Sequence, residues 1–207
     1  MPMQLIDRLR KQFEPNTLFL FSDIHEKALT EGALKEELLR LTKTGLVKRY
    51  GYGIYYLPDS KQENVPSALE AIRLRYLTDG KDIYGFYTGN DFLGGIMGRP
   101  VSLQDQLDIM TNKATSGKKT IFVFSKRITL RKPYFTINKN NISINSFLSY
   151  LSFAPLDEVK QNYSLLANYI RTNQLSANDV MKMATVFPSK TSTKLLASDL
   201  YRSLWKH

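Results

Sequence analysis

The chain has 207 residues, a formal net charge of +10, two histidines and no cysteine. The lack of cysteine excludes disulfides, thiolate metal sites and cysteine nucleophiles. Of the two histidines, His207 is the last residue and His25 stands alone, so we expect neither a histidine metal site nor a catalytic triad. No window approaches the roughly 18 uninterrupted apolar residues of a membrane helix, and the charged N-terminal segment does not resemble a signal peptide. We therefore expect a cytoplasmic protein without a membrane span. Because no phosphate-binding or other catalytic motif occurs, we expect no cofactor, no metal and no enzymatic activity.

The first predicted element is an amphipathic helix near the N-terminus. Four apolar residues between Leu5 and Phe13 repeat with the period of a helix, and Pro15 ends it. A second, short helix is predicted over 22–29, because Ser22 is a good N-cap and an acidic residue follows it in the first turn.

A third helix is predicted from an N-cap at Thr30 to a C-terminal stop at Gly45. Leu34, Leu38 and Leu41 line one of its faces. Its remaining surface mixes cations with carboxylates, and carboxylates are repelled by phosphate, so the helix is a poor general DNA-binding surface. These carboxylates are Glu31, Glu36 and Glu37.

Two short apolar runs then predict a β-hairpin with strands at Leu46–Tyr50 and Ile54–Leu57. Gly51 and Gly53 supply the positive φ that a tight connection needs. The order of elements is typical of a winged helix-turn-helix, in which the third helix enters the major groove and the hairpin, or wing, contacts phosphates. The alternative is a hairpin that only closes a small core. The candidate DNA-binding residues are Lys35, Arg40 and Lys43 on the helix and Lys48, Arg49, Tyr50 and Tyr52 on the wing.

The remaining chain alternates between helices and strands and then becomes helical. Ser67 and Glu70 predict a capping box for a helix over 67–78. Further strands are predicted within 82–88, 106–112, 118–125 and 126–132, a helix or turn over 89–98, and helices from Asn145 onward. We therefore predict an α+β protein of two domains. These are a winged helix-turn-helix DNA-binding domain over 1–60 and a mixed α/β domain over 61–207 that ends in a helical segment.

The positive charge is concentrated in the second predicted domain. Residues 1–60 hold nine Lys and Arg against eight Asp and Glu, and the rest of the chain holds twenty against eleven. No acidic residue occurs between Asp108 and Asp157, and a field of this kind attracts polyanions. Strand alternation predicts that Arg127 and Arg131 point outward. We therefore expect the basic residues of this stretch to form a surface that assists the winged helix in binding DNA. The alternative is a basic surface that only contacts solvent. The candidate surface comprises Lys113, Lys118, Lys119, Lys126, Arg127, Arg131, Lys132 and Lys139.

Several segments resemble the AbiEi-like antitoxins of type IV toxin–antitoxin systems. The resemblance is carried by LTKTGLVKRYGYGIYYLP at 41–58, by IYGFYTGNDFLGGIMG, QLDIMTNKATSGKK and ITLRKP within 83–133, and more loosely by FPSKTSTKLLASDLY at 187–201. It implies a bacterial protein whose winged helix represses its own operon by binding inverted repeats in double-stranded promoter DNA. It also implies a second domain that neutralises a toxin of the nucleotidyltransferase type, without necessarily forming a stable complex with it.

Two other functions remain open at the level of the sequence. In one, the wing is vestigial and the protein is a non-catalytic binding module that contacts protein or RNA through the basic surface of the second domain. In the other, which we favour least, the protein is an enzyme acting on nucleotides. Asp105 with Asp108, or Asp157 with Glu158, could bind a metal ion, but nothing near them in the sequence completes a site.

Overall fold

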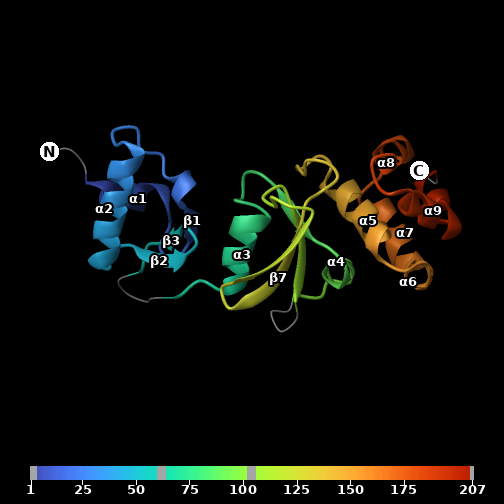
Figure 1. Ribbon diagram of the computed structural model, residues 1–207, viewed down its shortest axis with the longest axis horizontal. Coiled ribbons are helices and arrows are strands. Elements are labelled where there is room, and N and C mark those ends of the chain that lie inside the picture. Colours follow the sequence, from blue (N-terminus) through green and yellow to red (C-terminus); the bar gives the residue numbers. More distant parts are fainter. Residues whose placement is uncertain (1–3, 60–63, 102–105, 206–207) are drawn as a thin grey trace. The chain divides into compact units, whose positions relative to one another are not determined.

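The chain is an α+β protein that divides into two compact units, Met1–Arg75 and Tyr76–His207. The computed structural model describes residues 4–59, 64–101 and 106–205 (Figure 1). The predicted domain boundary between residues 60 and 61 lies outside these described residues. The first compact unit continues to Arg75 and therefore includes most of the helix that follows the predicted boundary.

The first unit combines helices with a three-stranded antiparallel sheet of order β1-β3-β2. Its core lies between the helices and the sheet, where Leu9, Phe19 and Leu38 are at most 1% exposed. Strand β1 was not predicted; it pairs with β3 along its whole length. The elements are α1 (Leu5–Gln12), β1 (Leu18–Leu20), the short 3₁₀ helix η1 (Phe21–Asp23), α2 (Glu31–Lys43), β2 (Lys48–Gly51) and β3 (Ile54–Tyr56).

Helix α2 forms as predicted. The hydroxyl of Thr30 accepts a hydrogen bond from the amide of Ala33, and Leu34, Leu38 and Leu41 are buried. Gly45 follows with a φ of 75°, a left-handed conformation that favours glycine at the end of a helix. The sequence therefore specifies this helix through its cap, its apolar stripe and its stop.

The predicted short helix over 22–29 is wrong, because only η1 forms and residues 24–30 are irregular. Side chains instead bind backbone groups in and beside this segment. The Asp23 carboxylate accepts from the amide of Leu20 at 2.8 Å, and the Glu26 carboxylate accepts from the amide of Ala28 at 2.7 Å. The side-chain amide of Gln12 exchanges two hydrogen bonds with the backbone of His25. Local side-chain hydrogen bonds of this kind compete with helix formation.

Helix α3 (Ala68–Tyr76) begins with the predicted capping box. The Ser67 amide donates to the Glu70 carboxylate at 2.6 Å, and the Glu70 amide donates to the Ser67 hydroxyl at 3.2 Å. Reciprocal bonds of this type satisfy two amides that have no partner inside the helix.

The second unit contains a four-stranded mixed sheet of order β4-β5-β7-β6. Strand β5 runs antiparallel to β4 and parallel to β7, and β6 pairs antiparallel with β7 as the outer strand. The strands are β4 (Gly85–Tyr87), β5 (Leu107–Thr111), β6 (Lys118–Val123) and β7 (Lys126–Arg131), and helix α4 (Asn90–Ile96) lies between β4 and β5 in the chain.

Helices make up the rest of the second unit and form its largest apolar core, centred on the buried helix α5 (Figure 1). The region that the sequence predicts to be helical from Asn145 onward divides into separate helices, with breaks at Asn162 and at Asp199, which has a φ of 61°. No helix in the described ranges is long and apolar enough to cross a membrane. The elements are α5 (Ile142–Phe153), α6 (Leu156–Gln161), α7 (Tyr163–Thr172), α8 (Ala177–Ala184), α9 (Ser189–Ala197) and η2 (Leu200–Leu204).

Candidate nucleic-acid interface

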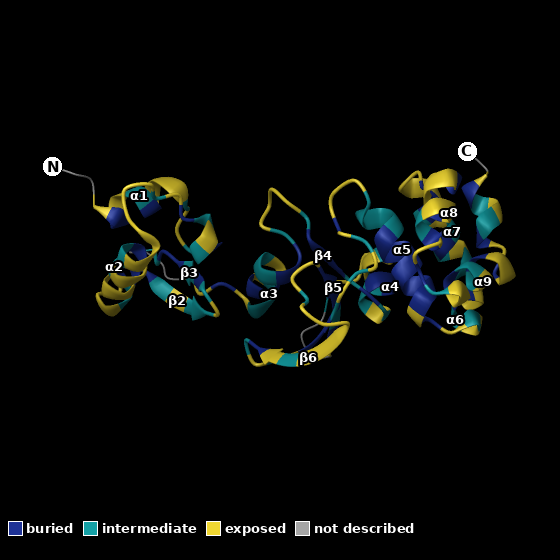
Figure 2. Cartoon of the chain, turned by 45° about the horizontal axis from the view of Figure 1, so that its top comes forward, coloured by how far each residue is buried: buried dark blue, intermediate teal, exposed yellow. Residues whose placement is uncertain are grey.

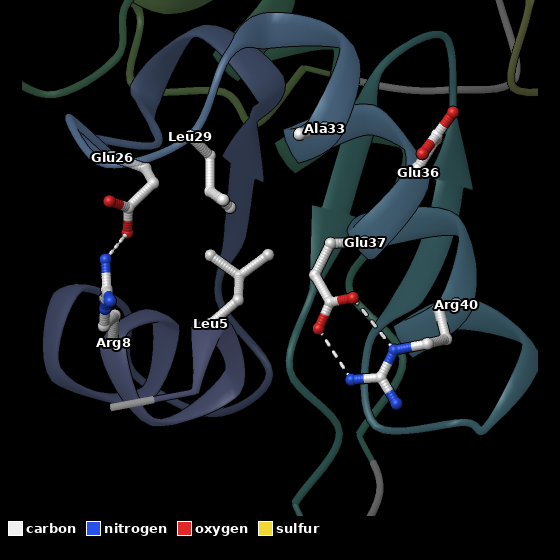
Figure 3. Close-up of a pocket in the computed structure, with 8 residues that line it drawn as sticks. All are labelled: Leu5, Arg8, Glu26, Leu29, Ala33, Glu36, Glu37 and Arg40. Atoms are coloured by element: carbon white, nitrogen blue, oxygen red, sulfur yellow. Dashed lines mark hydrogen bonds and ion pairs between the residues drawn. The ribbon is translucent and has the colours of Figure 1, made fainter. Parts of the chain in front are cut away.

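The surface of α2 has one acidic flank, which lies beside α1. This flank borders a pocket of about 470 Å³ (Figure 3). Arg40 donates hydrogen bonds of 2.9 and 2.6 Å to the carboxylate of Glu37. On the opposite side of the pocket, Arg8 pairs with Glu26. The bond from Arg40 holds the pKa of Glu37 below its usual value. Glu36 adds a third carboxylate, so a phosphate group would meet more negative than positive charge here.

The other flank of α2 borders a groove of about 370 Å³ beside the β2–β3 hairpin. Lys35 and Arg49 provide its cations, and none of its described lining residues is acidic. Lys35 pairs with Glu31 at the helix surface, and its Nζ lies 5.6 Å from the centroid of the Phe21 ring. The described residues that line the groove are Phe21, Lys35, Leu39, Thr42, Arg49, Gly53 and Tyr55. The groove is therefore the place where the helix and the hairpin present cations together.

The tip of the hairpin is held by α3. Tyr52 has a φ of 52° and is 51% exposed. The guanidinium of Arg75 donates a hydrogen bond to the Tyr52 carbonyl oxygen and lies 5.7 Å from the ring centroid of the same tyrosine. A bulge at Tyr50 shifts the register of β2, and burial, followed by the charge of Glu70, raises the pKa of the Tyr50 phenol.

The structure brings two of the seven predicted DNA-binding residues, Lys35 and Arg49, into one groove. Lys43 is exposed at the end of α2, Lys48 is half-buried in β2, and Arg40 lies on the acidic flank.

Sequence reasoning missed the groove residues Phe21, Leu39 and Tyr55. Leu39 is 56% exposed and lies four positions after Lys35, so a stripe at helical spacing was the available signal for it. Phe21 and Tyr55 come from other segments, and helical spacing could not identify them.

In the second unit, the register of the β6–β7 hairpin sorts the predicted basic residues between two faces. Phe122 lies opposite Arg127 and Lys118 opposite Arg131, so the side chains of each pair share one face. Lys119 follows Lys118 in the strand and therefore points to the other face.

Arg131 departs from the expected outward orientation. Its guanidinium donates hydrogen bonds of 3.0 and 2.9 Å to the two carboxylate oxygens of Asp108 and lies 4.4 Å from the centroid of the Phe153 ring. Its side chain is only 17% exposed. The acid-free stretch of sequence is therefore not free of acid in space, because β5 delivers a carboxylate to β7.

The other predicted cations of this surface lie at several places. Lys113 follows β5 and its Nζ lies 4.8 Å from the centroid of the Tyr84 ring. Lys126 is half-buried at the start of β7, whereas Lys132 and Lys139 are exposed beyond its end. Within the described part of the chain, no group of three or more His, Asp or Glu residues is placed to hold a metal ion.

No family model matches the sequence, and neither a curated protein nor a solved structure matches the chain.

Proposed function

We propose that the protein is a cytoplasmic transcriptional autorepressor and antitoxin of the AbiEi-like type, which binds double-stranded promoter DNA through its first unit. The order α1, β1, η1, α2, β2 and β3 fits a winged helix in which the second helix is reduced to η1. On this reading α2 enters the major groove and the β2–β3 hairpin is the wing. The observation that carries the proposal is the groove shared by Lys35 and Arg49.

The distribution of charge on α2 decides which flank meets the DNA. The flank beside α1 holds both of its arginines in pairs with carboxylates. On the flank beside the hairpin Lys35 also pairs with a carboxylate, that of Glu31, but Arg49 forms no ion pair with any residue that the structure describes. Counterion release from DNA rewards cations that can reach phosphate, so the hairpin flank binds and the α1 flank does not.

A matched pair of variants tests this orientation. Arg49→Gln and Arg40→Gln each remove one positive charge from the first unit. We expect Arg49→Gln to weaken binding to the protein's own promoter severalfold and to reduce the slope of log affinity against log salt by about 0.9. Arg40→Gln should leave both unchanged, because Glu37 already occupies that guanidinium. Gel-shift titrations over a range of salt concentrations measure both quantities.

Equal losses in the two variants would show that only net charge matters and would contradict the groove. If Arg49→Gln binds the promoter as the wild type does, the wing is not part of the DNA interface.

The antitoxin part of the proposal rests on the sequence resemblance and assigns neutralisation of a nucleotidyltransferase-type toxin to the second unit. The full-length double variant Lys48→Ala/Arg49→Ala should lose repression and still restore growth beside the toxin. A promoter reporter and a growth assay in the same cells measure the two activities. If the folded double variant also fails to restore growth, the two activities do not belong to separate units.

A further inference from the structure

The β6–β7 hairpin exposes a phenylalanine among the polar and charged residues of its two strands. Phe122 in β6 is 70% exposed, and β6 is one of the two edge strands of the sheet. Figure 2 shows β6 exposed over most of its length, in contrast to the buried strands β4 and β5. A single exposed apolar side chain needs no explanation, so the significance of Phe122 depends on its neighbours.

Those neighbours are defined by the register. Arg127 lies directly opposite Phe122, and Thr120 and Lys118 follow on the same face of β6. Toward β5 this face is covered by α5, whose Ser149 hydroxyl lies 3.2 Å from the Met110 sulfur. The part that remains open is a sheet corner, which we define as Lys118, Thr120, Phe122, Arg127 and the adjacent Gln106.

The sheet corner is positively charged. Its neighbouring carboxylate, Asp108, is neutralised by the two hydrogen bonds from Arg131. Lys118 and Arg127 take part in no ion pair with any residue in the described ranges. Their charges are therefore available to an anionic ligand.

Polar groups complete the corner. The side-chain amide of Gln106 donates to the Thr129 hydroxyl at 2.6 Å, and Thr129 lies 3.2 Å from the Thr120 hydroxyl. When Thr129 accepts from Gln106 and donates to Thr120, the Thr120 proton is left to donate outward and the Gln106 carbonyl oxygen is left to accept. The corner thus offers a donor and an acceptor beside the aromatic ring.

Backbone strain occurs at the same place. The two residues that connect β6 to β7, Phe124 and Ser125, have φ of 51° and 59°. Two-residue hairpins favour Asn-Gly for this conformation, and bulky residues adopt it rarely. Strain of this kind is concentrated at binding sites, where it holds side chains in a required position. Here the turn fixes the pairing of Phe122 with Arg127.

We propose that the sheet corner binds single-stranded RNA. One base stacks on Phe122, the cations Lys118 and Arg127 contact the backbone phosphates, and Thr120 with Gln106 contacts a ribose 2′-hydroxyl. Duplex DNA is excluded as the main ligand because its bases are already stacked on one another. Protein interfaces are depleted of lysine and apolar at their core, whereas this corner places one ring among polar groups and two cations that have no carboxylate partner among the described residues, so it fits RNA better than a protein partner.

The first test measures binding of the full-length protein to a short fluorescent oligouridine by anisotropy. Phe122→Ala should weaken binding about tenfold, and Phe122→Leu should weaken it equally because leucine cannot stack. Phe122→Trp should retain binding. Trp205→Ala is the matched control, because Trp205 is 68% exposed but lies outside the sheet corner, and it should bind as the wild type does.

A second set of variants tests the cations and the 2′-hydroxyl contact. Arg127→Gln should reduce the salt slope by about 0.7, the value for one phosphate contact with a single strand. Lys182→Gln in α8 removes the same charge away from the sheet and should have no effect. The oligodeoxyuridine of the same sequence should bind several times more weakly than the RNA. Arg49→Gln should leave RNA binding unchanged, which separates this site from the promoter interface.

Three results would overturn the proposal. Wild-type affinity in Phe122→Leu would show that the ring does not stack on a base. Equal affinity for the deoxy oligonucleotide would remove the RNA assignment. Absence of oligouridine binding, together with a change of oligomeric mass in Phe122→Ala, would identify β6 as a surface for self-association or for a protein partner.

Discussion

Helix α2 and the β6–β7 hairpin are both rich in cations, but they neutralise them in different ways. In α2 each partner lies one turn away, since Lys35 binds Glu31 and Arg40 binds Glu37. In the hairpin, Arg131 takes its partner Asp108 from another strand, 23 positions away in the chain. The other cations of the hairpin pair with no carboxylate among the residues that the structure describes. The comparison teaches that a charge can be judged from its sequence neighbours in a helix but not in a sheet.

The two arrangements also differ in energy. The side chains of Glu31 and Lys35 are 71% and 61% exposed, and an exposed pair of this kind contributes little to the stability of a helix because water and salt screen it. The side chains of Asp108 and Arg131 are 31% and 17% exposed, so breaking their pair leaves a mostly buried guanidinium without its acceptor. Long-range contacts should therefore dominate the stability of the sheet, and local contacts should have small effects in the helix.

Two glycines give the largest expected contrast. A Cβ added at Gly85 in β4 would overlap the Tyr76 carbonyl oxygen and lie 2.9 Å from that of Met110, so Gly85→Ala should destabilise the second unit by about 3 kcal/mol or more. A Cβ at Gly32 in α2 would meet nothing within 4 Å, and Gly32→Ala should stabilise the first unit by about 0.5 kcal/mol. Chemical denaturation of the two variants measures both changes. If Gly85→Ala is as stable as the wild type, the backbone around β4 shifts to make room for the added Cβ, and the expected contrast between the two glycines is wrong.

The ion pair of the sheet gives the next largest effect. Asp108→Ala should lower the free energy of unfolding by about 2 kcal/mol, because Arg131 loses both of its acceptors. Asp108→Asn is the control; it keeps one acceptor and should cost about half as much. Urea titrations with full-length protein measure both. A loss below about 0.5 kcal/mol for Asp108→Ala would show that this ion pair contributes as little to stability as an exposed one.

The smallest changes in stability are expected for the two exposed ion pairs of α2. Only one of the two substitutions that break them should change the affinity for promoter DNA. Glu31→Gln and Glu37→Gln should each change the melting temperature little, because both ion pairs are exposed to solvent. Glu31→Gln frees Lys35 in the groove beside the hairpin and should strengthen promoter binding severalfold, whereas Glu37→Gln frees Arg40 on the other flank and should not. Thermal melts and gel shifts measure the two quantities. Equal gains in promoter affinity for the two variants would show that both flanks of α2 contribute equally to DNA binding.

The elements that the sequence predicts correctly are those whose signals are local. Thr30 at the start of α2 and the Ser67–Glu70 box of α3 both form the expected hydrogen bonds. The helix predicted over 22–29 fails because its capping signal competes with other hydrogen bonds, including those between Gln12 and His25. Strand β1 was missed because its three residues are too few for a pattern to be distinguished.

The candidate sites likewise combine features that depend on neighbouring residues with features that depend on residues far apart in the sequence. The sequence by itself determined the α+β class, the length of α2, the β2–β3 hairpin and the excess of positive charge, because periodicity, caps, turns and composition are properties of neighbouring residues. Only the tertiary structure decided that Lys35 and Arg49 share a groove, that Arg131 is neutralised and that Phe122 is exposed beside Arg127. Each of these depends on the register of a sheet or on the packing of distant segments. A shift of one residue would turn every side chain of β6 to the opposite face.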